Sequence, residues 1–279
     1  MKASKASFER YSNITISLII ASLLPSMTAV SLRCSVYIIA NEIYNFVYYN
    51  TFHHNSEIDN PPKDCYYKVT MCYRFYIDLM NDKEKELREI IRVAEKSLLA
   101  EKFRDKLSKP LVTSGEVRPT DVTAVIAPGR KRDKAVFPMK WGFSLKGSKQ
   151  PLVNARVETA SVKPTFKNEW LSHRCIVPAS WYFEWEHFKS PDGKVKTGDK
   201  YSIQLRGANI TYLCGLYRFE DEYPVFTVLT REPSDELRRI HDRMPLILPE
   251  DMINDWIRPE SKQEELISYD LTDMAFERT

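Results

Sequence analysis

The chain has 279 residues, of which 43% are hydrophobic and 28% are charged, as in an ordinary globular protein. Its formal net charge of +3 is too small to indicate a nucleic-acid-binding protein by itself, so any basic binding surface must be local. The five cysteines form no C-x-x-C pair and have no metal-ligand spacing with the five histidines. We therefore expect no disulfide framework, no metal and no cofactor, and reduced thiols in a cytoplasmic protein.

Residues 1–70 differ in amino-acid pattern from the rest of the chain. Residues 14–30 form an apolar run that follows several basic residues, as in a signal peptide or a short membrane anchor. Three interpretations are open: an over-extended reading frame whose true start is Met71, a removed export or propeptide segment, and a real anchor. We favour the first, and expect residues 71–279 to form one domain that does not enter a membrane.

A helix is predicted over residues 82–103. Asn81 is a suitable N-cap, and Glu84 three residues later completes a capping box. Apolar residues then recur at helical spacing, at Leu87, Ile90, Ile91, Ala94 and Leu98. Residues 114–123 are expected to form a loop.

Short strands are predicted after this loop. Seven runs are rich in β-branched and aromatic residues: 122–126, 135–143, 176–177, 182–185, 201–205, 212–219 and 224–230. The turn sequence at residues 190–193 is typical of a hairpin and joins two of these runs.

Two further helices are expected near the C-terminus. Ser234 can cap a short helix that ends near Ile240, and Pro249 can begin another that carries Met252, Ile253 and Trp256 on one face. This order of elements predicts an α+β fold: a single compact domain of mixed, mostly antiparallel β-sheets with peripheral helices, and not a doubly wound sheet.

Cys72 is the strongest candidate for a nucleophile. If translation begins at Met71, removal of the methionine leaves Cys72 at the N-terminus, with a thiol of pKa about 8.5 beside an α-amine of pKa about 8. Together these groups can capture an aldehyde: the amine forms a Schiff base and the thiolate closes a five-membered thiazolidine. The alternative interpretation is a small buried hydrophobic residue at the start of a strand.

Two candidates for proton transfer follow. Glu184 lies between Phe183 and Trp185, and an aromatic setting should raise the pKa of its carboxyl group, as suits a general acid or base near pH 7. An outward-facing strand residue is the alternative. His241 could pass protons at ordinary pH, or could simply cap the end of a helix.

Four residues are candidates for DNA contacts. Asn154 and Arg156 are two apart in an extended segment and would face the same side, where an amide could orient a sugar and a guanidinium could hold a phosphate. Trp141 and Gly142 together offer a ring for stacking on a base beside a close backbone approach, although a tryptophan in an apolar strand is more often part of the core.

Taken together, these motifs resemble the SRAP family of SOS-response-associated peptidases, or abasic-site processing proteins. The resemblance runs from Met71 to about Trp256, and the matching pieces are Met71-Cys72-x-Arg74, Pro119-Thr120, Trp141-Gly142, Asn154-Ala-Arg156-x-Glu-Thr159, Arg174-Cys-x-Val-Pro178, Glu184-Trp185, Gly215-Leu-Tyr217, Thr227-x-Leu-Thr230 and His241-x-Arg-Met-Pro245.

The resemblance implies a monomer, located in the cytoplasm with the nucleoid, that binds single-stranded DNA and senses abasic sites. In this family the exposed cysteine forms a thiazolidine crosslink with the ring-opened sugar. By that analogy Cys72 is the nucleophile, Glu184 the acid/base, and His241 the group that assists ring opening and reversal.

The same analogy gives the remaining residues their roles. Asn154 would steady the N-terminal residue or the sugar. The DNA-binding residues would be Arg74, Trp141, Gly142, Arg156, Thr230 and Arg243, with the three arginines on phosphates. The family is also associated with a peptidase activity that would expose the cysteine by cutting off the chain's own leader.

One departure from the family pattern concerns the nucleophile, because the cysteine is residue 72 here and not residue 2. Two other functions therefore stay open. A conventional thiol peptidase would use Cys72 and His241 as a dyad that Glu184 orients. A non-catalytic module would only bind single strands. A crosslink that survives denaturation separates the first function from both.

Overall fold

The structure is a computed structural model, and it describes residues 74–80, 85–190 and 192–279. All of these lie in one compact unit, Val69–Thr279. Cys72, the proposed helix cap Asn81 with Glu84, and the whole of residues 1–70 lie outside the described residues, so the predictions made for them stay predictions.

The larger sheet has seven strands and closes on itself. The strands run in the order β11-β10-β4-β3-β6-β9, and because β9 also pairs with β10, the first and last strands of the central five meet. Their bounds are β3 (Val122–Pro128), β4 (Lys134–Trp141), β5 (Asn154–Arg156), β6 (Arg174–Ala179), β9 (Thr211–Glu220), β10 (Tyr223–Arg231) and β11 (Met244–Pro245).

Strand β10 organises one side of this closed sheet. It is parallel to β4 and, further along, to β5, whereas its pairings with β9 and β11 are antiparallel. Every residue of β6 is buried, and so are residues 122–127 of β3. Strands buried on both faces have the sheet interior on one side and covering elements on the other.

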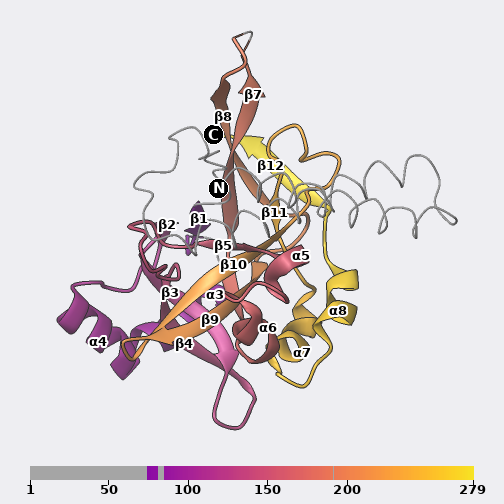
Figure 1. Cartoon of the computed structure of the whole chain (residues 1–279). Coiled ribbons are helices and arrows are strands. Elements are labelled where there is room, and N and C mark those ends of the chain that lie inside the picture. The colour runs from indigo at the N-terminus through magenta and orange to yellow at the C-terminus, as the bar shows by residue number, and fades with distance from the viewer. Residues whose placement is uncertain (1–73, 81–84, 191) are drawn as a thin grey trace, which may run out of the picture. The chain divides into compact units, whose positions relative to one another are not determined.

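The smaller sheet has five antiparallel strands in the order β12-β8-β7-β1-β2. Their bounds are β1 (Arg74–Ile77), β2 (Gly115–Val117), β7 (Trp181–Lys189), β8 (Val195–Leu205) and β12 (Met274–Arg278). Only Ser180 separates β6 of the large sheet from β7 of the small one. The β7–β8 hairpin projects at the top of Figure 1.

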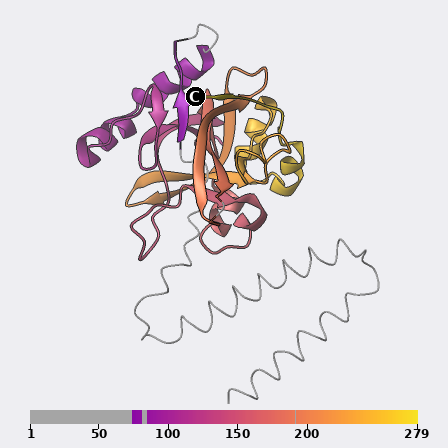
Figure 2. The ribbon, with the colours of Figure 1, turned by 90° about the horizontal axis from the view of Figure 1, so that it is seen from above.

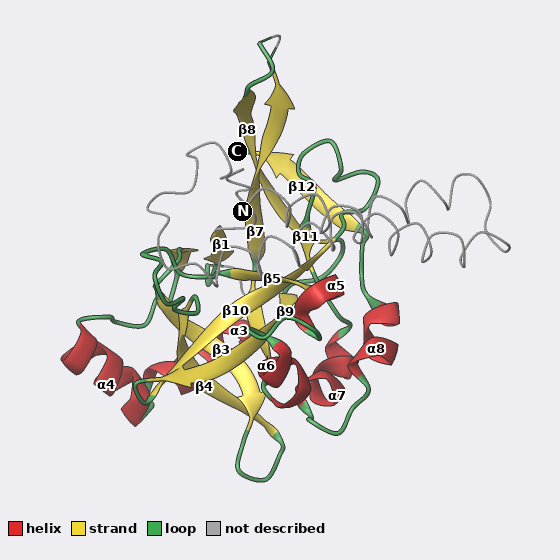
Figure 3. Ribbon diagram, viewed as in Figure 1, coloured by secondary structure: helices red, strands yellow, loops and turns green. Residues whose placement is uncertain are grey.

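Helices lie around the strands (Figure 3). In Figure 2, the helices of the purple N-terminal part and those of the yellow C-terminal part lie on opposite sides of the strands. Their bounds are α3 (Lys85–Glu95), α4 (Leu98–Leu107), α5 (Val157–Ala160), α6 (Lys167–Ser172), α7 (Ile253–Ile257) and α8 (Gln263–Leu266), with 3-10 turns at Glu250–Met252 and Ile267–Tyr269. The expected α+β fold, with mostly antiparallel sheets and peripheral helices, is thus confirmed.

The prediction of one continuous helix over residues 82–103 is wrong, because the described part of this segment forms two helices. Helix α3 stops at Glu95, and α4 starts at Leu98, because Ser97 takes an extended conformation and its Oγ accepts a hydrogen bond from the backbone N–H of Ala100 at 3.1 Å. That is an N-cap, which begins a new helix. The apolar face of α3 is as expected, with Leu87, Ile90, Ile91 and Ala94 buried.

The other elements agree with the sequence with three exceptions. Each of the seven expected runs lies on a strand, but β4 ends at Trp141, two residues short of the expected end. The expected loop at 114–123 contains β2 and the start of β3. Residues 235–240 form turns and not a helix, whereas the helical segment after Pro249 is present and buries Ile253 and Trp256.

Candidate active site

Glu184 lies near the middle of β7 and is only 3% exposed. Backbone pairing gives this strand a neighbour on each side: Phe183 lies opposite Arg74 of β1, and Glu184 lies opposite Tyr201 of β8. A carboxylate buried in such a strand is costly unless it has polar partners. This placement excludes the alternative in which Glu184 simply faces solvent.

The partner of Glu184 is His241, which is 5% exposed. The backbone N–H of His241 donates to Leu237 O at 3.0 Å, and the N–H of His187 on β7 donates to Ile240 O at 3.3 Å, which fixes the segment beside the strand. His241 Nε2 lies 3.9 Å from Glu184 Oε2. This is an ion-pair distance, longer than a hydrogen bond, in a buried setting suited to proton transfer.

The second ring nitrogen of His241 has three polar neighbours. Its Nδ1 accepts a hydrogen bond from the backbone N–H of Arg243 at 3.1 Å, and lies 3.1 Å from Asp242 Oδ1 and 3.3 Å from Arg243 O. When Nδ1 accepts, the proton of the neutral imidazole is on Nε2 and faces Glu184. When both nitrogens are protonated, the Asp242 carboxylate can accept from Nδ1. The surroundings of His241 therefore accommodate both protonation states.

His187 joins this pair, and the sequence analysis missed it. Its ring lies 5.1 Å from that of His241, at 68°. Burial and the neighbouring His241 lower the pKa of His187 below its ordinary 6.5, against the opposite effect of Asp242. The expected strand ended at residue 185, so His187 was outside it. Its position three residues after Glu184 on a hairpin strand was the available signal.

Arg243 has a different role from the one expected. Its guanidinium donates two hydrogen bonds to Glu158, at 2.8 and 2.7 Å, and one to Thr230 O at 2.6 Å, and the residue is 8% exposed. The geometry is that of a bidentate internal ion pair. Arg243 therefore ties the His241 segment to β10 and α5, and its charge is engaged within the protein instead of facing a phosphate.

Glu158 is the other residue that the sequence analysis missed here. Although burial alone would raise the pKa of its carboxyl group, the hydrogen bonds from Arg243 and its own backbone, with the charges of Arg243 and Arg156, hold the pKa below its ordinary value. The motif Asn154-Ala-Arg156-x-Glu158 contained the residue, but nothing in the spacing pointed to a partner 85 positions away.

Asn154, Arg156 and Thr230 lie on two neighbouring strands. Strand β5 runs beside β10, with Asn154 opposite Val228 and Arg156 opposite Thr230. Arg156 is exposed and Asn154 is partly buried. Thr230 is fully buried, so it can support this edge but presents no surface to a ligand in this conformation.

Trp141 belongs to the core. It has no exposed surface, its Nε1 donates to Val153 O at 2.9 Å, and its ring stacks on Phe226 with centroids 6.0 Å apart. A base cannot stack on a ring that is covered on both sides. Gly142 has φ 113°, and a Cβ there would meet Pro151 Cβ at 2.6 Å, so this glycine permits a close internal contact instead of an approach to DNA.

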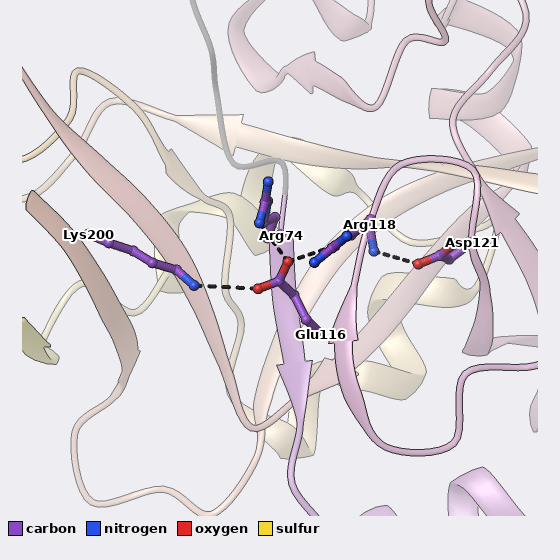
Figure 4. A network of polar contacts seen from close by, with 5 residues as sticks. All are labelled: Arg74, Glu116, Arg118, Asp121 and Lys200. Carbon is purple, nitrogen blue, oxygen red and sulfur yellow. Dashed lines mark hydrogen bonds and ion pairs between the residues drawn. The ribbon is translucent and has the colours of Figure 1, made fainter. Parts of the chain in front are cut away.

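Arg74 begins β1 and lies beside the aromatic residues of β7. Its guanidinium carbon is 5.2 Å from the centre of the partly exposed Trp185 ring, and its Nη1 donates to Glu116 Oε1 at 2.7 Å (Figure 4). Trp185 is thus the aromatic residue next to Glu184 that reaches the surface. Alternation along the aromatic run was the signal for it.

Within residues 74–80, 85–190 and 192–279 there is no group of three or more His, Cys, Asp or Glu side chains that could hold a metal ion. None of the helices in the described part of the chain is long and apolar enough to cross a membrane.

Two curated proteins are similar to this chain in sequence. The abasic site processing protein YoaM of Bacillus subtilis is 33% identical over 151 residues, which are 49% of this chain and 64% of that protein. The abasic site processing protein YedK of Escherichia coli is 34% identical over 156 residues, 50% of this chain and 66% of that protein. The matched segments thus span slightly less than two thirds of these relatives' own length.

A solved structure and a family model extend the comparison. A crystal structure of a Bacteroides thetaiotaomicron protein has a TM-score of 0.56 at 21% identity and covers 74% of this chain and 91% of that one, which shows a shared fold. The model of the SOS response associated peptidase family, SRAP, matches residues 71–277. Because that match takes in most of the sequence and all the elements described above except the very end of β12, the chain belongs to the SRAP family.

Proposed function

We propose that this protein binds single-stranded DNA that contains abasic sites and captures the sugar covalently through an N-terminal Cys72. The main support is the buried pair of Glu184 and His241, 3.9 Å apart, at β7, the strand that pairs with β1 at Arg74. The relatives named above are called abasic site processing proteins, which favours this substrate over a peptide.

The chemistry needs proton transfers at three stages. In the ring-closed abasic sugar, a base removes the proton of the hemiacetal hydroxyl while an acid protonates the ring oxygen, and the aldehyde is released. The α-amine of Cys72 then adds to the aldehyde carbon, and one proton moves from its nitrogen to the former aldehyde oxygen. An acid protonates the resulting hydroxyl, which leaves as water, and a base takes the second proton from nitrogen to leave an imine. Finally the thiol gives up its proton, the thiolate adds to the imine carbon, and the nitrogen takes up a proton as the thiazolidine closes.

Glu184 and His241 are suited to these steps. Glu184 would donate the proton to the departing hydroxyl and accept one in the reverse reaction, which is general acid/base catalysis. His241, whose environment accommodates both protonation states, would assist opening of the sugar and its reversal. The backbone hydrogen bond from Arg243 and the carboxylate of Asp242 would keep the imidazole directed at Glu184.

The pairing of β1 supports a role for Cys72 in this reaction. Arg74, two positions after Cys72 in the sequence, pairs with Phe183, the residue directly before Glu184. The exposed guanidinium of Arg156 and that of Arg74 are the groups expected to hold phosphates.

The direct test is covalent capture by the form that begins at Cys72. Mixed with a single strand bearing one abasic site, it should give a product that survives SDS, and Cys72→Ala should give at most a weaker imine that requires reduction to be trapped. An otherwise identical strand without the abasic site is the control. Equal amounts of SDS-resistant product from Cys72→Ala would rule out this chemistry, and cleavage of peptides without capture would favour the thiol peptidase.

A further inference from the structure

The side chain of Glu116 lies among three cations from three different elements (Figure 4). Its Oε1 accepts from Arg74 Nη1 at 2.7 Å and from Arg118 Nε at 2.8 Å, and its Oε2 lies 3.4 Å from Lys200 Nζ. Asp121 takes no part in the pairing, because its Oδ2 accepts the backbone N–H of Arg118 at 2.9 Å and so fixes the loop after β2.

The sheet brings these groups to neighbouring strands. Strands β2, β1, β7 and β8 follow one another in the sheet, and carry Glu116, Arg74, Trp185 and Lys200 in that order. Trp185 lies directly opposite Lys200. Lys200 Nζ lies 3.6 Å from the centre of the Phe183 ring and 5.4 Å from that of Trp185, so the cations lie against an aromatic surface.

The charges do not balance within this cluster. With Glu116 and the carboxylate of Asp121 beside Arg118, the three cations still leave an excess of one positive charge. Like charges this close repel one another unless an anion lies between them. Burial alone would raise the pKa of Glu116, but the hydrogen bond from Arg118 and the charges of Arg74 and Lys200 keep it below its ordinary value, so the carboxylate stays ionised.

The cations also remain open to a ligand. The exposed fractions of the side chains are 37% for Arg74, 62% for Arg118 and 27% for Lys200, whereas Glu116 is 19% exposed. An excess of positive charge beside a partly exposed aromatic ring, here Trp185, is the pattern by which proteins bind the backbone and bases of a single strand. The carboxylate is thus the inner part of the cluster and the cations are its outer part.

We propose that Glu116 is a positioning residue that holds Arg74, Arg118 and Lys200 together as one phosphate-binding surface beside Trp185. The ligand would be a backbone phosphate of the single strand whose neighbouring base lies on the Trp185 ring. This inference rests on the proposed function and adds to it Arg118, Lys200 and the acidic residue that orders them.

Whether Glu116→Gln weakens or tightens DNA binding shows whether Glu116 positions the cations or only contributes a negative charge. Removal of a negative charge from a DNA-binding surface should tighten binding if charge alone matters. If Glu116 orders the cations, its loss leaves three mutually repelling side chains to be ordered at the moment of binding, which lowers affinity. We expect the full-length chain with Glu116→Gln to bind about tenfold more weakly, and Glu116→Asp, which keeps the charge, to recover part of the loss.

The measurement is fluorescence anisotropy with a labelled oligothymidine that has no abasic site, at several salt concentrations. Glu220→Gln is the matched control, since Glu220 is also a largely buried carboxylate that pairs with an arginine, Arg218, but on the other sheet. If Glu116→Gln bound the oligothymidine as tightly as the Glu220→Gln control, or more tightly, the inference would be wrong.

A second pair of variants covers the case in which Glu116→Gln does not fold. Arg118→Ala removes one exposed cation of the surface, and should lower the slope of log affinity against log salt by about 0.7. Arg104→Ala, an exposed arginine on α4 that pairs with Asp105, should leave the slope unchanged. If both variants have the same salt slope while the wild-type chain binds the single strand, the inference is wrong and the proposed function stands. If the wild-type chain binds no single strand, both the proposed function and the inference are wrong.

Discussion

Glu184 and His241 are both more than nine-tenths buried, and an ionisable pair at such a place needs a reason. Desolvation of a carboxylate costs free energy that packing alone does not return. Groups of this kind occur preferentially where protons are moved. The aromatic residues around Glu184 on β7 therefore have two effects, since they build the strand and also keep water from the carboxylate.

Glu184→Gln tests this assignment, because glutamine keeps the shape but cannot exchange a proton. We expect the form beginning at Cys72 to bind an intact single strand nearly as before, and to crosslink to an abasic strand about 10²–10⁴-fold more slowly. Single-turnover kinetics at saturating DNA measure the rate. Glu186→Gln, a less buried carboxylate on the same strand, is the control and should crosslink at the wild-type rate. Lost DNA binding with a normal rate would make Glu184 structural.

His187 gives a prediction about pH. Because the folded pKa of this histidine is lowered from 6.5, the unfolded chain binds a proton that the folded chain does not bind between the two pKa values. This contribution to stability is complete above pH 6.5 and is lost as the pH falls toward the folded pKa. The Tm should therefore decrease between pH 7.5 and 5.5, and His187→Gln should reduce that decrease.

The same scans include a control for His187. His173→Gln removes a histidine whose ring contacts Tyr217 instead of another histidine, and it should leave the pH dependence of the Tm as in the wild type. If the Tm of His187→Gln decreased with pH as steeply as that of the wild type, His187 would not contribute to the pH dependence of stability. The comparison must stay above pH 5, since protonation of carboxylates such as Glu158 also destabilises the fold at lower pH.

The sequence could identify reactive residues but not all of their partners. Glu184, His241 and Arg156 stood out because each is an uncommon residue type for its local pattern. Arg243 looked equally available for a phosphate, yet its charge is used by Glu158, which lies 85 positions earlier. A local pattern carries no information on such a long-range contact, and the same holds for the burial of Trp141, whose Nε1 donates to Val153 O.

At the scale of elements, β5 and β11 both pair with β10 and place two arginines with different roles, Arg156 on β5 and Arg243 directly before β11. Arg156→Ala should weaken binding to single-stranded DNA and lower the salt slope by about 0.7, since it removes one phosphate contact. Arg243→Ala should instead destabilise the fold by about 1–3 kcal/mol, because it leaves the buried carbonyl of Thr230 and the half-buried carboxylate of Glu158 without their donor. Anisotropy and urea unfolding on both variants measure the two effects. The reverse pattern would return Arg243 to the DNA-binding residues.

Helix α4 provides a test of the break at Ser97. Ser97→Ala removes the Oγ that accepts from the N–H of Ala100, and should lower the free energy of unfolding by about 1 kcal/mol. The exposed Ser114 is a suitable control, and Ser114→Ala should change stability by less than about 0.5 kcal/mol. If Ser97→Ala matched the control in urea titrations, the cap would not be what separates α3 from α4.

This break also explains why helix prediction went wrong there. The apolar spacing of Leu87 through Leu98 fits one helix, but only the part up to Ala94 is buried, and Leu98 is 78% exposed. Helical periodicity therefore continued past the point where the burial that supports it had ended. A serine at position 97, followed by Glu101 in the first turn of α4, was the local sign of a new start.

At the scale of the whole molecule, strand positions were predictable but their closure was not. The parallel pairing of β10 with β4 and β5 joins segments that are distant in sequence, and no hairpin signal marks it. That pairing nevertheless positions the site, since it sets Arg156 beside Thr230 and, through Arg243, fixes the approach of His241 to β7. The site thus depends on contacts that only the closed sheet creates.

The last prediction concerns what precedes Cys72 in the working protein. In the full chain the nitrogen of Cys72 is part of a peptide bond and cannot form an imine, so the thiazolidine cannot close. We expect the 279-residue chain to give no SDS-resistant product with an abasic strand, and the form beginning at Cys72 to give it. A form with one alanine added before Cys72 has the same thiol and the same fold but no cysteine amine, and should behave like the full chain.

Intact mass of the protein recovered from its natural host, together with the mass of the crosslinked peptide, measures both points. The recovered protein should begin at Cys72, and the crosslinked peptide should carry the sugar on its N-terminal residue, with the loss of one water. A stable product of equal yield from the alanine-extended form would mean that the thiol alone captures the sugar. In that case the α-amine has no part in the reaction, and residues before Cys72 would not need to be removed for activity.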